Sequence, residues 1–191
     1  MDIRRFLFRY RGYTPLPLLC IALWVADPTA ESLAWGFAAA IIGEFIRIWG
    51  VGYIGPETRT VDAPGGTKLV TTGAFAYVRN PIYIGNIILY IGVGIMTNVW
   101  WIAVVGYIYF QIQYALIISA EEEHLEKTYG MEYREYKKHV RRYIPRLTAH
   151  KTSSPIFHYF DLINGLRSEK RTFEAITATM IIMSAIFFWK N

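Results

Sequence analysis

The chain has 191 residues, of which 53% are hydrophobic and 16% aromatic, a content that is high for a soluble protein of this length. Its net charge is +5, but 18 of the 20 Lys and Arg residues lie in three blocks, residues 1–12, 55–80 and 121–173. Basic residues grouped between apolar runs are typical of the cytoplasmic segments of a membrane protein, and no pattern indicates nucleic-acid binding. The single cysteine, Cys20, excludes an intramolecular disulfide and zinc sites built from several cysteines.

Five apolar segments indicate an all-α integral membrane protein with about five transmembrane helices, folded as a single domain over residues 1–191. The first segment, residues 13–26, is short for a full crossing. It follows an arginine-rich start without a signal-peptide cleavage site, so we expect a retained anchor. The loop 27–31 has no Lys or Arg, and the second segment, residues 32–54, is long enough to cross. These charges place the N-terminus on the cytoplasmic side.

Residues 82–120 form a run of 39 positions without a charged side chain. As a helix this run would measure roughly 58 Å, about twice the thickness of the hydrocarbon core of a bilayer. The run therefore predicts a helical hairpin, the third and fourth spans, with its tip at Thr97 and Asn98. The charged motifs before and after the run would then meet at one face of the membrane, where we expect the active site.

The remaining segments are less regular. Residues 121–146 predict a helix that is interrupted at Gly130 and then resumes. Tyr133 and Tyr136 share one face of the second part among basic residues, which fits either a helix on the membrane surface or one packed over the preceding loop. The fifth apolar segment, residues 175–189, is short, and we expect it to cross a thinned bilayer or to lie in the interface.

Polar side chains within the apolar segments are candidates for a substrate pocket. Glu44 and Arg47 share a helix face, so they either border such a pocket or form a structural ion pair. Asn86 and Gln111 belong to polar stripes on the third and fourth segments, which either line a pocket or bond to each other across the helix seam. We predict the pocket, because both stripes end where the charged motifs converge.

The carboxylates Glu121, Glu122 and Glu123 follow directly on membrane-embedded sequence, where a cationic ligand would suit them. His124 has no companion His or Cys at ligand spacing, so we predict no metal site. No residue stands out as a general base. The candidates for a catalytic role are Tyr83, Glu122 and His124.

From Gly43 to Arg146 the chain resembles the superfamily of isoprenylcysteine carboxyl methyltransferases and phospholipid methyltransferases. The matching strings are Gly43-Glu44-x-x-Arg47, residues 69–85 with Arg79-Asn80-Pro81-Ile82-Tyr83 at their centre, Glu121-Glu122-Glu123-His124-Leu125, and Ile144-Pro145-Arg146. Residues 1–42 would then supply the anchor and the start of the second span. Residues 147–191 would be a C-terminal extension with a short apolar helix.

The resemblance implies an integral membrane enzyme that transfers methyl from S-adenosylmethionine at the cytoplasmic face. We favour a prokaryotic cytoplasmic membrane, with the endoplasmic reticulum as the alternative. It places the cofactor in a pocket formed by the loop before the hairpin and the helices after it. The cofactor is cationic, and carboxylates and aromatic faces suit it. Carried over by position, the cofactor-binding residues are Lys68, Leu69, Val70, Phe75, Asn80, Pro81, Ile82, Tyr83, Glu121 and Glu122.

Two positions depart from the family pattern. Asn80 replaces the usual His of an Arg-His-Pro signature, and Ile117 stands where carboxyl methyltransferases have an Arg that would engage an acceptor carboxylate. The acceptor is therefore left open among a prenylcysteine carboxylate, a phospholipid amine and another lipophilic group from the bilayer. A sterol-type reductase that uses NADPH and a non-catalytic membrane scaffold remain as alternative functions, and the oligomeric state is also open.

Overall fold

A computed structural model describes residues 3–54, 69–151 and 159–190, and within these ranges all regular structure is helical. This confirms the all-α prediction. The elements are α1 (Ile3–Tyr10), α2 (Leu16–Val25), α3 (Ala30–Tyr53), the short 3-10 helix η2 (Gly73–Ala76), α4 (Pro81–Met96), α5 (Trp100–His139), α6 (Leu162–Ser168) and α7 (Lys170–Lys190).

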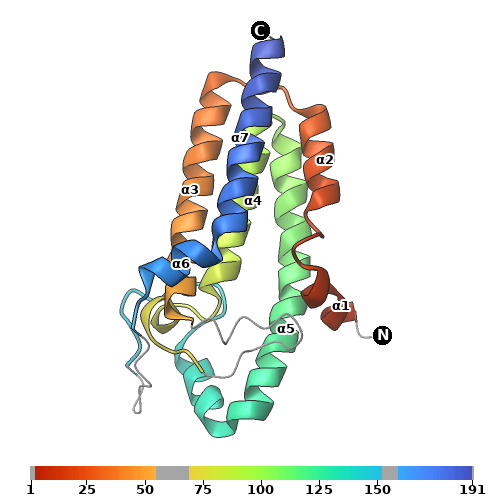
Figure 1. The fold of residues 1–191 in the computed structure, drawn as a ribbon. Coiled ribbons are helices and arrows are strands. Elements are labelled where there is room, and N and C mark those ends of the chain that lie inside the picture. Colours follow the sequence, from red (N-terminus) through yellow and green to blue (C-terminus); the bar gives the residue numbers. More distant parts are fainter. Residues whose placement is uncertain (1–2, 55–68, 152–158, 191) are drawn as a thin grey trace.

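Three of the helices, α3, α5 and α7, are long and apolar enough to cross a membrane. The other two apolar helices, α2 with 10 residues and α4 with 16, are shorter. At 1.5 Å per residue they measure roughly 15 and 24 Å, below the ~30 Å hydrocarbon core. The expectation of a short fifth segment was wrong. Helix α7 begins at Lys170 and runs for 21 residues alongside α3 and α4, so it is part of the bundle (Figure 1).

Glycines bring α3 and α4 into close contact. A Cβ atom added at Gly43 would lie 2.6 Å from the carbonyl oxygen of Gly85, and one at Gly36 would lie 2.5 Å from that of Gly92. Membrane helices often pack through small residues, because association there depends on close van der Waals contact. This close contact between the helices brings Arg47 of α3 against Asn86 on the polar face of α4.

The predicted hairpin is confirmed. Helix α4 ends at Met96, the Thr97 hydroxyl donates to the carbonyl of Gly94 at 2.7 Å, and Asn98 adopts a left-handed conformation with φ 57° before α5 begins. Asn tolerates this conformation better than most residues. The backbone N–H of Asp27 donates to the carbonyl of Thr97 at 2.9 Å, so the hairpin tip and the loop after α2 lie at the same end of the bundle.

The C-terminus lies at this end too, and the N-terminus lies toward the opposite, basic end (Figure 1). The helix α5 turns sharply at Gly130, where φ is 53° and ψ is −118°, as the sequence predicted. Beyond Gly130 the buried Tyr133 and Tyr136 pack with Leu69, and the Tyr136 hydroxyl donates to the carbonyl of Phe75 at 2.7 Å. This end of α5 therefore covers the loop before α4, as the second of the two alternatives predicted.

Candidate active site

The motifs that flank the hairpin meet at the basic end of the bundle. Arg79 from the loop before α4 forms a salt bridge of 2.9 Å with Glu122 of α5, and Arg142 binds the same carboxylate at 2.5 Å. The hydrogen bonds to Glu122 raise the pKa of Arg142 above its ordinary value, so this guanidinium stays charged. The two arginines occupy both oxygens of the buried Glu122 and bind the loop firmly to α5.

Asn80, which stands in place of the family histidine, helps to hold the same loop. Its side-chain Nδ2 donates to the carbonyl of Arg142 at 3.3 Å, and the backbone N–H of Arg79 donates to the carbonyl of Arg141 at 2.9 Å. Asn80 also precedes Pro81, which occupies the first turn of α4. The backbone N–H groups of a first helical turn have no acceptor within the helix, so the missing N–H of proline costs no hydrogen bond there. The turn therefore keeps its shape through hydrogen bonds that an amide can make.

A cavity of about 790 Å³ lies behind this loop, within the usual size range of ligand pockets. It is bordered by α1, α2 and the connection between them, by α3, α4, α5 and α7, and by the loop before α4. Lys68 lies outside the described residues. All the other predicted cofactor-binding residues line the cavity: Leu69, Val70, Phe75, Asn80, Pro81, Ile82, Tyr83, Glu121 and Glu122.

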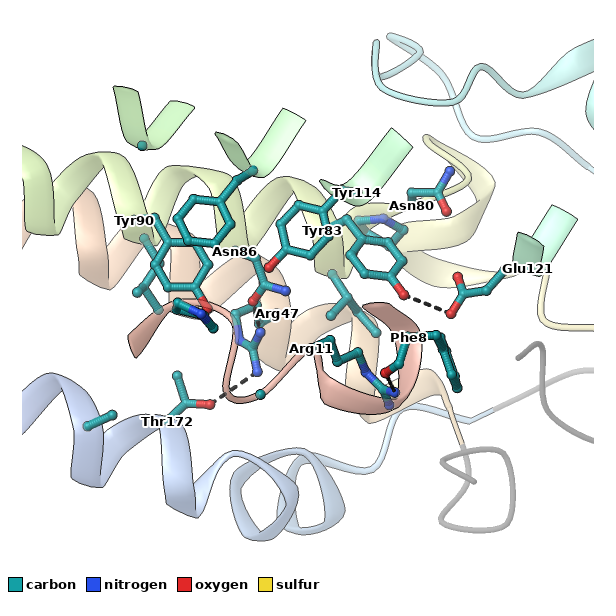
Figure 2. A pocket seen from close by; sticks show the side chains of 18 of the residues that line it. Phe8, Arg11, Arg47, Asn80, Tyr83, Asn86, Tyr90, Tyr114, Glu121 and Thr172 are labelled. Carbon is teal, nitrogen blue, oxygen red and sulfur yellow. Dashed lines mark hydrogen bonds between the residues drawn. The ribbon is translucent and has the colours of Figure 1, made fainter. Parts of the chain in front are cut away.

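At the basic end of the cavity the Tyr83 hydroxyl donates to Oε1 of Glu121 at 2.7 Å (Figure 2). The Tyr83 ring contacts the ring of Tyr114, with 4.8 Å between the centroids. Tyr83 lies in the first turn of α4 and Glu121 lies on α5, so the pair depends on the hairpin. A carboxylate that is taken out of water with one neutral donor gains much from a cationic ligand.

Deeper in the cavity, Arg47 lies at the centre of a polar network. It donates to Glu44 at 3.1 Å and to Thr172 at 3.1 Å, and it also bonds to Asn86 and Glu169. Glu169 is fully buried at the junction of α6 and α7. Both interpretations of the α3 pair therefore hold in part: Glu44 and Arg47 form an ion pair, and Arg47 also lines the cavity together with Asn86.

Other predicted residues lie elsewhere. Gln111 is not among the residues that line the cavity, and its side-chain Nε2 donates to the hydroxyl of the exposed Tyr107 at 3.0 Å. His124 lies outside the cavity near Thr128, and Glu123 pairs with Arg4 and Lys127 on the surface. Within residues 3–54, 69–151 and 159–190 no cluster of His, Cys, Asp or Glu could hold a metal ion.

Beyond the polar groups the cavity wall is apolar. One side comes from α2 and α7, the other from the hairpin, and sequence reasoning missed the contribution of α2 and α7 because their apolar residues do not mark which face is buried. Representative lining residues are Leu18, Leu19, Val93, Ile102, Phe110 and Ile176. The cavity therefore combines a charged end with a long hydrophobic wall.

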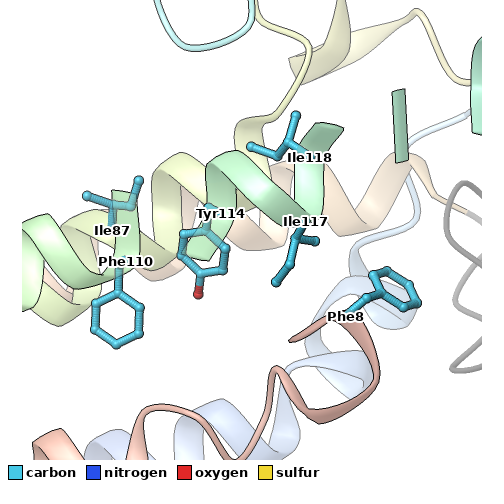
Figure 3. Close-up of a cluster of buried hydrophobic side chains, with 6 residues drawn as sticks. All are labelled: Phe8, Ile87, Phe110, Tyr114, Ile117 and Ile118. Atoms are coloured by element: carbon cyan, nitrogen blue, oxygen red, sulfur yellow. The ribbon is translucent and has the colours of Figure 1, made fainter. Parts of the chain in front are cut away.

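A cluster of buried side chains supports the wall formed by the hairpin (Figure 3). Phe8 of α1 packs there with Phe110, Tyr114 and Ile117 of α5. Ile117 has no exposed surface, so the position where related carboxyl methyltransferases have an Arg is filled here by packing against α1.

A family model described as phospholipid methyltransferase matches residues 32–132, more than half of the chain. Two curated relatives align over 131 residues, 69% of this chain and 56% of each relative, so the chain spans little more than half their length. They are the nickel-cobalt-cadmium resistance protein NccN of Alcaligenes xylosoxydans xylosoxydans, 28% identical, and the cobalt-zinc-cadmium resistance protein CzcN of Cupriavidus metallidurans, 27% identical. No solved structure matches the chain.

Proposed function

Because this chain belongs to the phospholipid methyltransferase family, we propose that it transfers a methyl group from S-adenosylmethionine to a lipophilic acceptor drawn from the membrane. One observation carries the proposal: the Tyr83–Glu121 pair and a long apolar wall line the same cavity. Such a cavity suits a charged methyl donor next to a membrane-derived acceptor. The family match supports this function over the reductase and the scaffold. The basic segments around the site favour the cytoplasmic face.

The residues at the charged end fit this methyl donor. Oε1 of Glu121 accepts from Tyr83, whereas Oε2 has no hydrogen-bond donor among the described residues and is open to an ammonium group. Leu69, Val70 and Phe75 form the adjacent wall. When bound, the cofactor would supply a sulfonium methyl group that an acceptor can attack in line, with the thioether S-adenosylhomocysteine as the leaving group.

The remaining task of the protein is to align the reactants and to exclude water. The Glu122 ion pairs fix the loop that carries the apolar wall, so the wall keeps its position relative to α5. An amine acceptor must lose a proton before it attacks, whereas a carboxylate or thiolate needs no base. Glu122 is enclosed by arginines and His124 lies outside the cavity, so Tyr83 is the one earlier candidate that we retain for a proton transfer.

The proposal is tested with the full chain in a maltoside detergent. Calorimetric titration measures the binding of S-adenosylmethionine and S-adenosylhomocysteine to the wild type, to Glu121→Gln and to Glu123→Gln. The substitution of Glu121 keeps a hydrogen-bond acceptor but removes the charge, so we expect binding at least tenfold weaker, a loss of about 1.4 kcal/mol or more. Glu123 is a matched control because it lies on the surface.

Transfer is then measured with isotopically labelled methyl donor and a total lipid extract of membranes. We expect labelled lipid with the wild type and with Glu123→Gln, and strongly reduced label with Glu121→Gln. Folded wild-type protein that binds neither ligand would refute the proposal, as would Glu121→Gln protein that binds both as tightly as the wild type. Binding without transfer to any lipid would favour the scaffold.

A further inference from the structure

Arg11, in the segment between α1 and α2, lines the cavity although it lies outside the region that matches the family model. Its positive charge interacts with Tyr83 and with Glu121, which places it close to the proposed methyl-donor end. Figure 2 shows its side chain between the Arg47 guanidinium and the Tyr83–Glu121 pair. Arg11 therefore borders both the charged end and the start of the apolar wall.

The hydrogen bonds of Arg11 differ from those of the other arginines in the cavity wall. Arg47 is paired with Glu44 and Glu169, and Arg79 is paired with Glu122. Among the described residues Arg11 forms no ion pair.

The one side-chain hydrogen bond found for Arg11 among the described residues runs from Nη1 to the carbonyl of Phe8 at 2.7 Å. Its guanidinium lies 4.1 Å from the centroid of the Phe8 ring, and Phe8 is itself held by packing against α5. A guanidinium carries five N–H donors, so several donors remain for a ligand in a side chain that is already held in place.

The charges of the cavity indicate which ligand the remaining N–H donors of Arg11 bind. If the proposed function holds, Glu121 faces the positive methyl donor, and the carboxylates at Arg47 and Arg79 are already engaged. The exposed Arg171 of α7 also lines the cavity and forms no ion pair with a described residue. Glu121 offsets only part of this positive charge, because it also faces the cationic cofactor. A negative group on the methyl acceptor that enters the cavity would balance the remainder.

We propose that Arg11 binds an anionic group, a carboxylate or a phosphate, on the lipophilic methyl acceptor. The inference rests on the proposed function. The planar guanidinium fork matches the two oxygens of either group, and hydrogen bonds between charged partners are the stronger kind. The cavity that Arg11 borders is also lined by Leu18, Leu19 and Ile176, so the anion is carried by a hydrocarbon chain rather than free in solution.

The test uses decyl phosphate and decanoate as probes, and titrates them into the full chain in a neutral maltoside detergent. Inorganic phosphate supplies the anion without a chain, and decanol supplies the chain without an anion. The variants are Arg11→Gln, which removes the charge, and Arg11→Lys, which keeps the charge but loses the fork. Arg9→Gln is the matched control, because Arg9 is exposed on α1 and does not line the cavity.

For decyl phosphate and decanoate we expect dissociation constants at least tenfold higher with Arg11→Gln, an intermediate increase with Arg11→Lys, and less than a threefold change with Arg9→Gln. Decanol and inorganic phosphate should bind the wild type at least tenfold more weakly than decyl phosphate. A Tm for Arg11→Gln within about 2 °C of the wild type, measured by circular dichroism in the same detergent, would show that the variant is folded.

The proposal is overturned if Arg11→Gln binds both probes within threefold of the wild type, since Arg11 would then only cap the end of α1. It is also overturned if Arg9→Gln loses as much affinity, because the effect would then be one of general surface charge. Inorganic phosphate that binds as tightly as decyl phosphate would mean a free anion instead of an acceptor group. These results do not depend on whether the wild type binds the methyl donor, so the two proposals can fail separately.

Discussion

Replacing Glu169 by Gln should loosen the C-terminal helices from the rest of the bundle. Glu169 is fully buried, bonds to the Arg47 guanidinium and accepts a hydrogen bond of 2.8 Å from Thr172. Removing one partner of a buried ion pair costs about 3–5 kcal/mol, because the other charge is left poorly compensated. Glu44 still pairs with Arg47 at 3.1 Å and Gln can still accept a hydrogen bond, so we expect the lower end, about 3 kcal/mol.

Thermal unfolding followed by circular dichroism in detergent measures the change. A loss of 1 kcal/mol lowers Tm by about 2–4 °C in a chain of this size, so Glu169→Gln should lower Tm by roughly 6–12 °C. Glu174→Gln is the matched control, since Glu174 is exposed on α7 and lies 3.9 Å from Lys170. In a double-mutant cycle with Arg47→Gln the two effects should be strongly non-additive. A Tm within 1 °C of the wild type for Glu169→Gln would refute the reasoning.

Two further predictions concern the helix contact and the loop. Gly43→Ala places a methyl group 2.6 Å from the Gly85 carbonyl oxygen, and such overpacking costs about 1–3 kcal/mol, so Tm should fall. Gly106→Ala is the control, because the nearest atom lies 3.5 Å from the added methyl group and Tm should not fall. A Gly43→Ala protein as stable as the wild type would contradict the close contact. Tyr136→Phe removes the hydrogen bond to Phe75, should cost about 1 kcal/mol and should weaken S-adenosylhomocysteine binding through a looser loop. Unchanged stability and binding would show that the hydroxyl does not hold the loop.

The hairpin was predictable because its signal is local. A run without charge and about twice the bilayer thickness has few alternatives to crossing and returning, so the placement of both charged motifs at one end of the bundle followed from length alone. The ion pair between Arg79 and Glu122 came only from the structure. The break in α5 was predictable for a similar reason, since Gly130 adopts a positive φ that other residues avoid. The family strings could also be read from neighbouring residues, and they gave the loop residues that line the cavity.

The sequence by itself therefore determined the all-helical class, the hairpin and the end of the bundle where the charged motifs lie. The tertiary structure alone decided which polar side chains share the cavity: Asn86 lines it and Gln111 does not, and Arg11 lines it from outside the family match. Glu169, also outside that match, holds Arg47 in place. The physical reason is that a membrane helix is apolar on its lipid face as well as on its buried face, so hydrophobic periodicity does not tell the two apart. The inward faces are chosen by the packing of helices that are distant in the chain.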